Sequence, residues 1–243
     1  MNYCENNLIR FYSVPHVRNY IKRQLQLELL GEVPVLSIRT EPLQNPVNRL
    51  AKRLFDLTFS SLFLLTIFPF MYLIVGLIIK ITSPGPIFFK QERNGENGKI
   101  FKCYKFRSMK VNALSDSLQA TKNDPRKTKF GNFLRKSNLD ELPQFINVFK
   151  GEMSIVGPRP HMLKHTEEYS QLINKYMMRH LVKPGITGWA QVTGYRGETK
   201  ELSQMEGRVR RDLWYIENWT FLLDIRIMIK TVTNMFRGEK NAY

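Results

Sequence analysis

The sequence predicts an α+β fold that is mostly helical, with a re-entrant membrane helix hairpin, interfacial amphipathic helices and a small β-hairpin around a compact core. An uncharged apolar run over residues 57–79 is long enough to cross a bilayer. Two strand-like segments with Asn-Gly pairs between them follow, and a long helical pattern lies near the C-terminus. A chain of 243 residues can hold one core of ordinary size, so these parts are expected to surround a single core.

The charge balance indicates an anionic partner. Lys and Arg number 37 against 21 Asp and Glu, which gives a formal net charge of +16. Such an excess favours nucleic acid, an anionic membrane face or a phosphorylated substrate. Cys4 and Cys103 form no disulfide or metal pattern, which favours a reducing, cytosolic setting. The mostly polar stretch 1–20 lacks the apolar segment of a signal peptide.

Residues 1–45 are predicted to be the remnant of an upstream α/β domain plus a linker, and residues 46–243 the second, membrane-associated domain. The pattern predicts a helix over 17–30 and a short buried strand over 33–38. Because one helix and one strand cannot form a core, this part is expected either to dock on the rest or to belong to a larger domain.

The membrane segment is predicted to extend over about residues 54–80. Basic residues flank it on both sides, namely Arg49, Lys52 and Arg53 before it and Lys80, Lys90 and Arg93 after it. The positive-inside rule places both flanks in the cytoplasm, and Pro69 can break the helix in its middle. These features favour a broken helix that enters and leaves on one face. An ordinary kinked span is the alternative.

Further elements follow the membrane segment. Residues 87–93 and 99–106 are predicted to form the β-hairpin, and the polar, basic stretch 111–129 a mobile loop. Residues 161–181 read as a helix. Residues 208–236 combine apolar, aromatic and basic side chains, which suits a helix in a membrane interface or one packed on the core.

Two adjacent carboxylates, Asp140 and Glu141, stand before a predicted helix that ends at Gly151. Because Pro143 is tolerated only in the first helical turn, the helix is expected to start near Asp140, with this residue as its N-cap. An ionised carboxylate there is a competent nucleophile toward phosphorus, and Glu141 can hold Mg²⁺. Asp and Glu also occur at helix starts for capping alone.

Basic neighbours favour phosphate chemistry over capping. Arg135 lies just upstream of the acids, and Arg159 is fixed between two prolines in a Gly-Pro-Arg-Pro turn. A rigidly placed guanidinium suits bidentate contact with phosphate. Lys105 adds charge at the end of the predicted hairpin. The sequence therefore predicts a site for an anionic, phosphate-bearing substrate.

Several motifs make the chain resemble the bacterial sugar transferases, polyprenyl-phosphate hexose-1-phosphate transferases with one re-entrant membrane helix. The resemblance runs from about residue 48 to 243. The motifs are residues 52–56 (KRLFD), 82–86 (TSPGP), 101–109 (FKCYKFRSM), 139–160, 183–191 (KPGITGWAQ) and 212–219 (DLWYIENW).

The resemblance implies a reaction. It implies transfer of a sugar 1-phosphate from a UDP-sugar to undecaprenyl phosphate, with release of UMP and an aspartyl-phosphosugar intermediate. This step would initiate exopolysaccharide, capsule or O-antigen synthesis. Asp140 would be the nucleophile, and Asp140 and Glu141 would hold Mg²⁺. Lys105, Arg135 and Arg159 match positions linked to substrate phosphates.

The resemblance also implies a setting, the cytoplasmic face of the bacterial inner membrane with its anionic lipids, and a possible homodimer. The family's helix break often falls at Ser-Pro, whereas here it is Phe68-Pro69. Larger relatives carry extra membrane helices and a nucleotide-binding-like domain before the catalytic part. Residues 1–42 resemble the end of that domain, so a shortened form or a fragment is expected.

Other kinds of function fit less well. A catalytically inactive membrane scaffold of a polysaccharide assembly complex is the alternative to an enzyme, and the intact acid pair argues against it. Residues 122–136 lack the interleaved aromatic residues of a single-strand binder, so no nucleic acid is expected as partner. His161 and His165 have helical spacing but no third zinc ligand.

Overall fold

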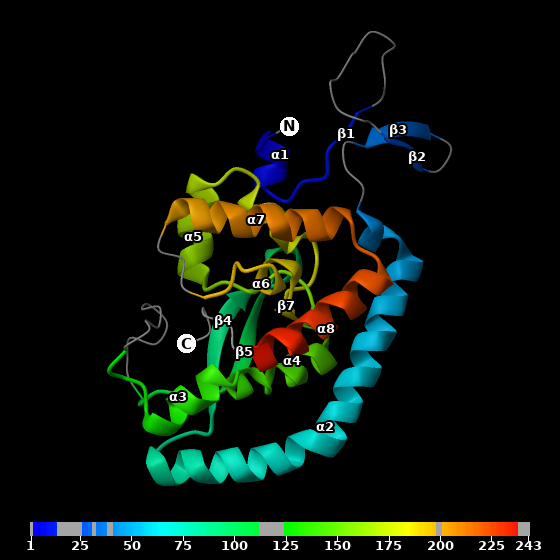
Figure 1. Cartoon of the computed structure of the whole chain (residues 1–243). Helices are drawn as coiled ribbons and strands as arrows, with labels where there is room; N and C mark the ends of the chain where they lie inside the picture. The colour runs from blue at the N-terminus through cyan, green and yellow to red at the C-terminus, as the bar shows by residue number, and fades with distance from the viewer. Residues whose placement is uncertain are drawn as a thin grey trace.

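A computed structural model describes residues 2–13, 26–30, 33–37, 41–111, 124–197 and 201–237. Within these residues the fold is mostly helical and contains three small sheets. Figure 1 shows one long, bent helix that runs along the side and the lower edge of a body made of the other elements. The mostly helical α+β fold predicted from the sequence is confirmed.

The N-terminal part contains helix α1 (Asn2–Asn6) and strands β1 (Tyr12–Ser13), β2 (Gln26–Leu30) and β3 (Val33–Ser37). The strands form an antiparallel sheet in the order β1-β3-β2. The strand predicted at 33–38 is confirmed. The helix predicted over 17–30 is wrong at its C-terminal end, because β2 pairs with β3 and this pairing overrides helix propensity. The remainder of that predicted helix lies outside the described residues.

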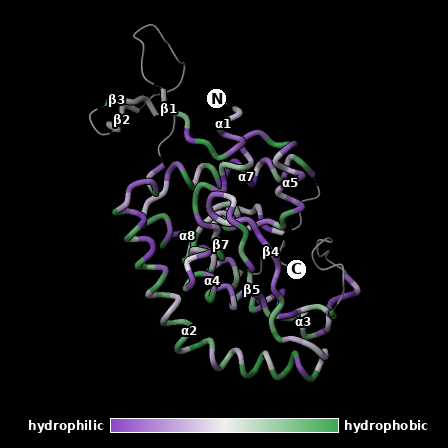
Figure 2. Tube along the Cα trace, turned by 180° about the vertical axis from the view of Figure 1, so that it is seen from behind, coloured by the Kyte–Doolittle hydropathy of each residue, from purple (hydrophilic) through white to green (hydrophobic). Residues whose placement is uncertain are grey.

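Helix α2 (Pro46–Thr82) follows the 3₁₀ helix η1 (Pro42–Gln44) and holds Pro69 in its interior. Among the described residues, α2 is the helix whose length and apolar composition are sufficient to cross a membrane. It consists of two legs that meet at a bend (Figure 1), and hydrophobic residues occupy much of its length (Figure 2). Entry and exit on one membrane face stays a prediction.

Both legs of α2 pack against the body. In the first leg the ring of Phe63 stacks on Phe145 with centroids 4.2 Å apart. Beyond Pro69, Val75 and Ile79 are buried in a cluster with Phe106 and Leu134. A buried ion pair between Lys52 Nζ and Asp224 Oδ2, 2.6 Å long, also fixes the start of α2 to the body. Packing contacts with the body therefore hold α2 on both sides of its bend.

The predicted hairpin is confirmed as β4 (Phe88–Asn94) and β5 (Ile100–Phe106), which pair antiparallel with Phe88 opposite Phe106. The 3₁₀ helix η2 (Glu96–Gly98) connects the strands, and Asn97 has a positive φ of 55°. Asparagine tolerates this backbone conformation, as the turn prediction requires.

Helix α3 (Lys129–Lys136), the 3₁₀ helix η3 (Leu139–Glu141) and helix α4 (Gln144–Lys150) follow. The prediction that Asp140 caps an α-helix is wrong, because Asp140 lies inside η3 and Pro143 is the N-cap of α4. Asn138 turns the chain with a φ of 58° before η3 begins. Gly151 ends α4 with a φ of 85°, as predicted.

Two short strands, β6 (Ser154–Val156) and β7 (Gly185–Thr187), pair in parallel. Helix α5 (Leu163–Leu172) and the 3₁₀ helix η4 (Tyr176–Leu181) lie between them. The single helix predicted over 161–181 is wrong, because Ile173 turns into a buried cluster and Lys175 takes a φ of 67°. The predicted loop over 111–129 lies mostly outside the described residues.

Helices α6 (Trp189–Val192), α7 (Leu202–Glu217) and α8 (Phe221–Arg237) complete the chain. The predicted helical stretch 208–236 is thus two helices. Leu223 and Ile227 of α8 are buried in the core, while Leu222 and Ile229 are exposed. One face of α8 therefore packs on the core, and the other remains available to an apolar environment.

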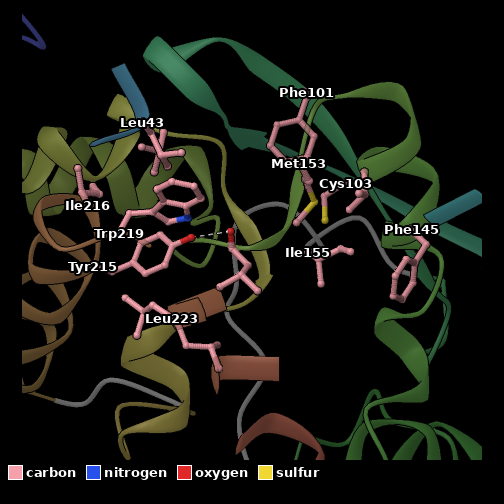
Figure 3. Packing of buried hydrophobic residues seen from close by; sticks show 14 residues of the cluster. Leu43, Phe101, Cys103, Phe145, Met153, Ile155, Tyr215, Ile216, Trp219 and Leu223 are labelled. Atoms are coloured by element: carbon pink, nitrogen blue, oxygen red, sulfur yellow. Dashed lines mark hydrogen bonds between the residues drawn. The ribbon is translucent and has the colours of Figure 1, made fainter. Parts of the chain in front are cut away.

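The main core joins α4, β6, α7 and α8. Figure 3 shows Tyr215 and Trp219 between Leu43 and Leu223, with Met153, Cys103 and Ile155 grouped farther along the cluster and Phe145 beyond them. The buried Tyr215 hydroxyl donates to the carbonyl of Val156 at 3.1 Å. This core fixes β6 and the turn that follows it, which bears directly on the site.

Candidate functional site

The acid pair lies on η3, and basic side chains from two other segments contact it. Glu141 Oε1 accepts a bond from Lys105 Nζ at 2.6 Å, at the end of β5. The two terminal nitrogens of Arg159 donate to both oxygens of Glu141, at 3.1 and 2.6 Å. The structure thus brings together three of the predicted residues through a carboxylate with two cationic partners.

Asp140 lies beside this cluster but, unlike Glu141, forms no ion pair with its cations. It is 7% exposed, and its carboxylate has no hydrogen bond or ion pair with any residue that the structure describes. Burial raises the pKa of Asp140 from 3.8 to about 6, and the charge of Glu141 adds to this rise. Lys105, Arg135 and Arg159 counteract part of it. At neutral pH the carboxylate is therefore mostly ionised but poorly solvated.

Glu141 shows the opposite behaviour. Burial alone would raise its pKa, but the charges of Arg159 and Lys105 and their hydrogen bonds hold the pKa of Glu141 well below its usual value. The same contact with Glu141 raises the pKa of Arg159 above its ordinary value. The two neighbouring carboxylates thus differ in their electrostatic state: the pKa of Glu141 is lowered by its cationic partners, whereas the pKa of Asp140 is raised by burial.

The turn that carries Arg159 is held by β7. Gly157 donates to the carbonyl of Thr187 at 2.8 Å, and Gly185 donates to the carbonyl of Pro158 at 2.9 Å. A Cβ at Gly157 would collide with the backbone of Lys183, so this close approach requires glycine. The backbone on the N-terminal side of Arg159 is therefore fixed.

Arg179 and Asp212 support the same turn, and sequence reasoning missed both. Arg179 Nη2 donates to the carbonyl of Arg159 at 2.9 Å and to Asp212 Oδ2 at 2.6 Å. The Arg179 and Asp212 side chains are only 1% and 2% exposed. The presence of Asp212 in the motif at 212–219 was the available signal, but its partner lies on a distant segment.

The other predicted residues occupy the edges of the site. Arg135 Nε donates to Ser108 Oγ at 2.9 Å, which holds Arg135 beside the end of β5. Arg107, between Lys105 and Ser108, donates to the carbonyls of Ser83 and Pro84. Pro69 is not part of the cluster, although its neighbour Phe68 packs on Phe106 next to Lys105. The C-terminal end of α2 is thus connected to the site through β5.

The site offers hard oxygen ligands for a metal ion. The described residues contain no group of three or more His, Cys, Asp or Glu side chains that could hold one. Mg²⁺ often uses only one or two carboxylates and completes its shell with water and substrate phosphates. The unpaired oxygens of Asp140 fit this pattern, and Glu141 contributes oxygens already shared with two cations.

Comparison with known proteins identifies the family. Residues 47–238 match the bacterial sugar transferase family. The chain belongs to this family. The resemblance predicted from the motifs is therefore confirmed, and the match includes all five residues of the predicted polar site.

Individual bacterial sugar transferases are similar over much of the chain. The UDP-glucose:undecaprenyl-phosphate glucose-1-phosphate transferase of Escherichia coli (strain K12) is 52% identical over 233 residues, which cover 95% of this chain and 49% of that protein. The exopolysaccharide production protein PSS of Rhizobium leguminosarum bv. phaseoli is 45% identical over 77% of this chain and 96% of that protein.

A third sugar transferase carries a different sugar in its name. The UDP-N-acetylgalactosamine-undecaprenyl-phosphate N-acetylgalactosaminephosphotransferase of Aeromonas hydrophila is 35% identical over 93% of this chain and 54% of that protein. The chain spans about half the length of the first of these relatives. Similarity alone therefore supports a sugar transferase and leaves the sugar open.

Proposed function

We propose that this chain transfers a sugar 1-phosphate from a UDP-sugar to undecaprenyl phosphate and releases UMP, as the first step of exopolysaccharide, capsule or O-antigen synthesis. The observation that carries the proposal is the unequal acid pair. Glu141 is bound by Lys105 and Arg159, whereas Asp140 is buried, without a partner among the described residues, and flanked by the same cations. A carboxylate with unengaged oxygens beside several cations can act as a nucleophile toward phosphorus, and this supports the proposal.

The reaction would proceed in two displacements. An oxygen of Asp140 attacks the phosphorus that bears the sugar. The new Asp–phosphorus bond forms while the bond to the bridging oxygen breaks, and UMP leaves with the electron pair. A phosphate oxygen of undecaprenyl phosphate then attacks the same phosphorus, forms the diphosphate bridge and displaces the carboxylate of Asp140. The enzyme returns to its starting state without net change.

The neighbouring residues have separate roles in this scheme. Glu141 orders Lys105 and Arg159, which face the charge that develops on the phosphoryl oxygens. Arg135, which also lowers the pKa of Asp140, adds charge on the side of α3. Asp140 and Glu141 would hold Mg²⁺, which when bound neutralises charge on the substrate phosphates.

We propose that α2 enters and leaves the inner membrane on its cytoplasmic face, among anionic lipids. The bend, the exposed apolar surface and the basic residues at both ends support this topology. Val47→Cys and Pro86→Cys, each in a Cys4→Ser background, lie at the two ends of the membrane segment. Labelling of both from the same side supports re-entry, and labelling from opposite sides shows a spanning helix.

A homodimer would be tested by light scattering in detergent.

The activity is tested by UMP release from purified protein with undecaprenyl phosphate and Mg²⁺. UDP-glucose is the first donor to test and UDP-N-acetylgalactosamine the second, because these sugars appear in the names of relatives. Asp140→Asn is expected to abolish UMP release and the labelled phosphosugar adduct, while Glu167→Gln, on the exposed face of α5, keeps both. If folded protein releases no UMP with any donor, the enzyme proposal is wrong and an inactive scaffold becomes the better account.

A further inference from the structure

A pocket of about 450 Å³ lies at the start of α2. Its wall includes η1, the first turns of α2, the 3₁₀ helix η2 and residues 181–183, and none of the five residues of the predicted polar site lines it. The pocket is therefore separate from the acid pair. Three acidic side chains line it, beside five basic ones that are contributed by Arg10, Arg49, Lys52, Arg53 and Lys183.

Most of the charged side chains in this pocket are already engaged. The ion pairs are Arg10–Glu41 at 3.6 Å, Arg49–Glu96 at 3.2 Å and Lys52–Asp224 at 2.6 Å. Asp56, the third acidic side chain of the wall, accepts a hydrogen bond from the backbone nitrogen of Ile155 at 3.0 Å. Arg53 and Lys183 are therefore the two cations of the wall that form no ion pair with a carboxylate that the structure describes.

Arg53 and Lys183 approach each other beside Gly151, which ends α4. A Cβ at Gly151 would lie 3.4 Å from Nη2 of Arg53 and 3.6 Å from Nζ of Lys183. Arg53 donates to the carbonyls of Val148 and Phe149 at 2.7 and 2.8 Å, whereas Lys183 makes no hydrogen bond with any described residue. Burial lowers the pKa of Lys183, and the charge of Arg53 adds to this effect, which nearby carboxylates partly offset. A bound anion would stabilise both cations.

An apolar surface adjoins the pocket. Leu50 lines the pocket and is 59% exposed, and Leu54, one turn farther along α2, is 54% exposed. Side chains four positions apart lie on the same face of a helix, so this surface leads from the pocket into the predicted membrane segment. The pocket lies at the end of the first leg that is opposite the bend (Figure 1). Charge and apolar surface together suit an amphiphilic ligand.

We propose that this pocket binds the phosphate of an anionic phospholipid through Lys183 and Arg53, with an acyl chain along Leu50 and Leu54. The inference goes beyond the transferase reaction and rests on the membrane placement of α2 proposed above. An ammonium and a guanidinium bind phosphate oxygens through charge-assisted hydrogen bonds. Arg53 retains donors for this contact, because a guanidinium has five N–H groups and two of them serve the carbonyls of α4. The bound lipid would hold the first leg of α2 at the membrane surface.

Lys183→Gln and Lys80→Gln form a matched pair for the test. Lys80 is exposed in the last turn of α2, so its replacement removes the same charge at the other end of the membrane helix. Delipidated protein in detergent is titrated with phosphatidylglycerol, and native mass spectrometry measures the Kd of the first bound lipid. Lys183→Gln should raise this Kd about tenfold, the size of one lost charge-assisted hydrogen bond, and Lys80→Gln should stay within about twofold of the wild type.

Glycerol phosphate distinguishes a lipid from a soluble phosphate, because it carries the phosphate group without acyl chains. It should bind at least about tenfold more weakly than phosphatidylglycerol, since it buries no apolar surface beside Leu50. Equal affinity for the two probes would overturn the assignment to a lipid. An equal rise of the lipid Kd in both lysine variants would show a general attraction between charges and would overturn the site.

Lipid binding needs no turnover, so this inference and the transferase proposal can fail separately. Weaker phosphatidylglycerol binding by Lys183→Gln than by Lys80→Gln supports the inference even if no donor is turned over. Wild-type lipid binding by folded Lys183→Gln overturns it, whether or not UMP is released. A higher KM for undecaprenyl phosphate in Lys183→Gln, together with wild-type phosphatidylglycerol binding, would assign the pocket to the acceptor and would also overturn the inference.

Discussion

Replacing the proposed nucleophile should stabilise the protein while it removes activity. In the folded protein the pKa of Asp140 is raised from 3.8 to about 6, chiefly because the carboxyl is buried. The folded state therefore prefers the protonated form, and ionisation at neutral pH works against folding. The uncharged amide that Asp140→Asn introduces resembles the protonated carboxyl and carries no such penalty.

The magnitude follows from the two pKa values. At about 1.4 kcal/mol for each pH unit between them, ionised Asp140 costs the fold about 3 kcal/mol. The stability that the protonated form contributes is fully present below about pH 4 and is lost as the pH rises through about 6. For a chain of this size, about 3 kcal/mol corresponds to a rise of roughly 6–12 °C in Tm.

Tryptophan fluorescence melts in lipid nanodiscs test the sign and the pH dependence. The Tm of Asp140→Asn should exceed that of the wild type at about pH 8, and the difference should shrink toward about pH 4. Glu141→Gln is the opposite control, because the pKa of Glu141 is lowered and its ionised form holds Lys105 and Arg159. Its Tm should fall. A lower Tm for Asp140→Asn at about pH 8, or equal shifts in the two variants, would refute the reasoning.

Two further predictions concern catalysis. The value of kcat/KM for UMP release should rise with pH through an apparent pKa of about 6 and then level off, because Asp140 must be ionised to attack. A pH profile that is flat between about 5 and 8 would contradict this. Asp212→Asn removes the ionic partner of the buried Arg179, so a loss of about 3–5 kcal/mol in stability is expected. Because Arg179 also holds the carbonyl of Arg159, kcat should fall as well, which kinetics of the folded fraction would show.

Local chemistry was sufficient to predict some elements. The hairpin β4-β5 follows from its Asn-Gly turns, and the apolar composition of α2 identified the long helix. The predictions were wrong where contacts between segments far apart in the sequence determine the secondary structure. Residues 26–30 form a strand because β3 pairs with them, and the helix over 161–181 is interrupted where Ile173 enters a buried cluster. The single sequence contains neither contact.

At the site, too, some features were predictable from the sequence and others depend on contacts between distant segments. The residue types that phosphate chemistry needs were evident, and Glu141 does join Lys105 and Arg159. The capping role expected for Asp140 was wrong because Pro143 has no N–H and stands as the N-cap, so that the preceding residues form a separate 3₁₀ turn. The supporting contacts made by Arg179 depend on segments brought together by folding, and no spacing in the sequence indicates them.

The many basic residues of the chain contribute in two ways: through their net charge and through the hydrogen bonds that individual guanidinium groups make. Several guanidinium groups bridge two backbone carbonyls: Arg53 those of Val148 and Phe149, Arg107 those of Ser83 and Pro84, and Arg208 those of Tyr195 and Gly197. These arginines organise the start of α2, its end and the turn between α6 and α7. An ammonium group lacks the planar fork that makes such bridges, so exchange of arginine for lysine would keep the net charge and lose the geometry. The net charge of +16 suits the anionic substrates and lipids proposed above. The choice of arginine at these three positions is explained by the pairs of backbone carbonyls that each guanidinium bridges.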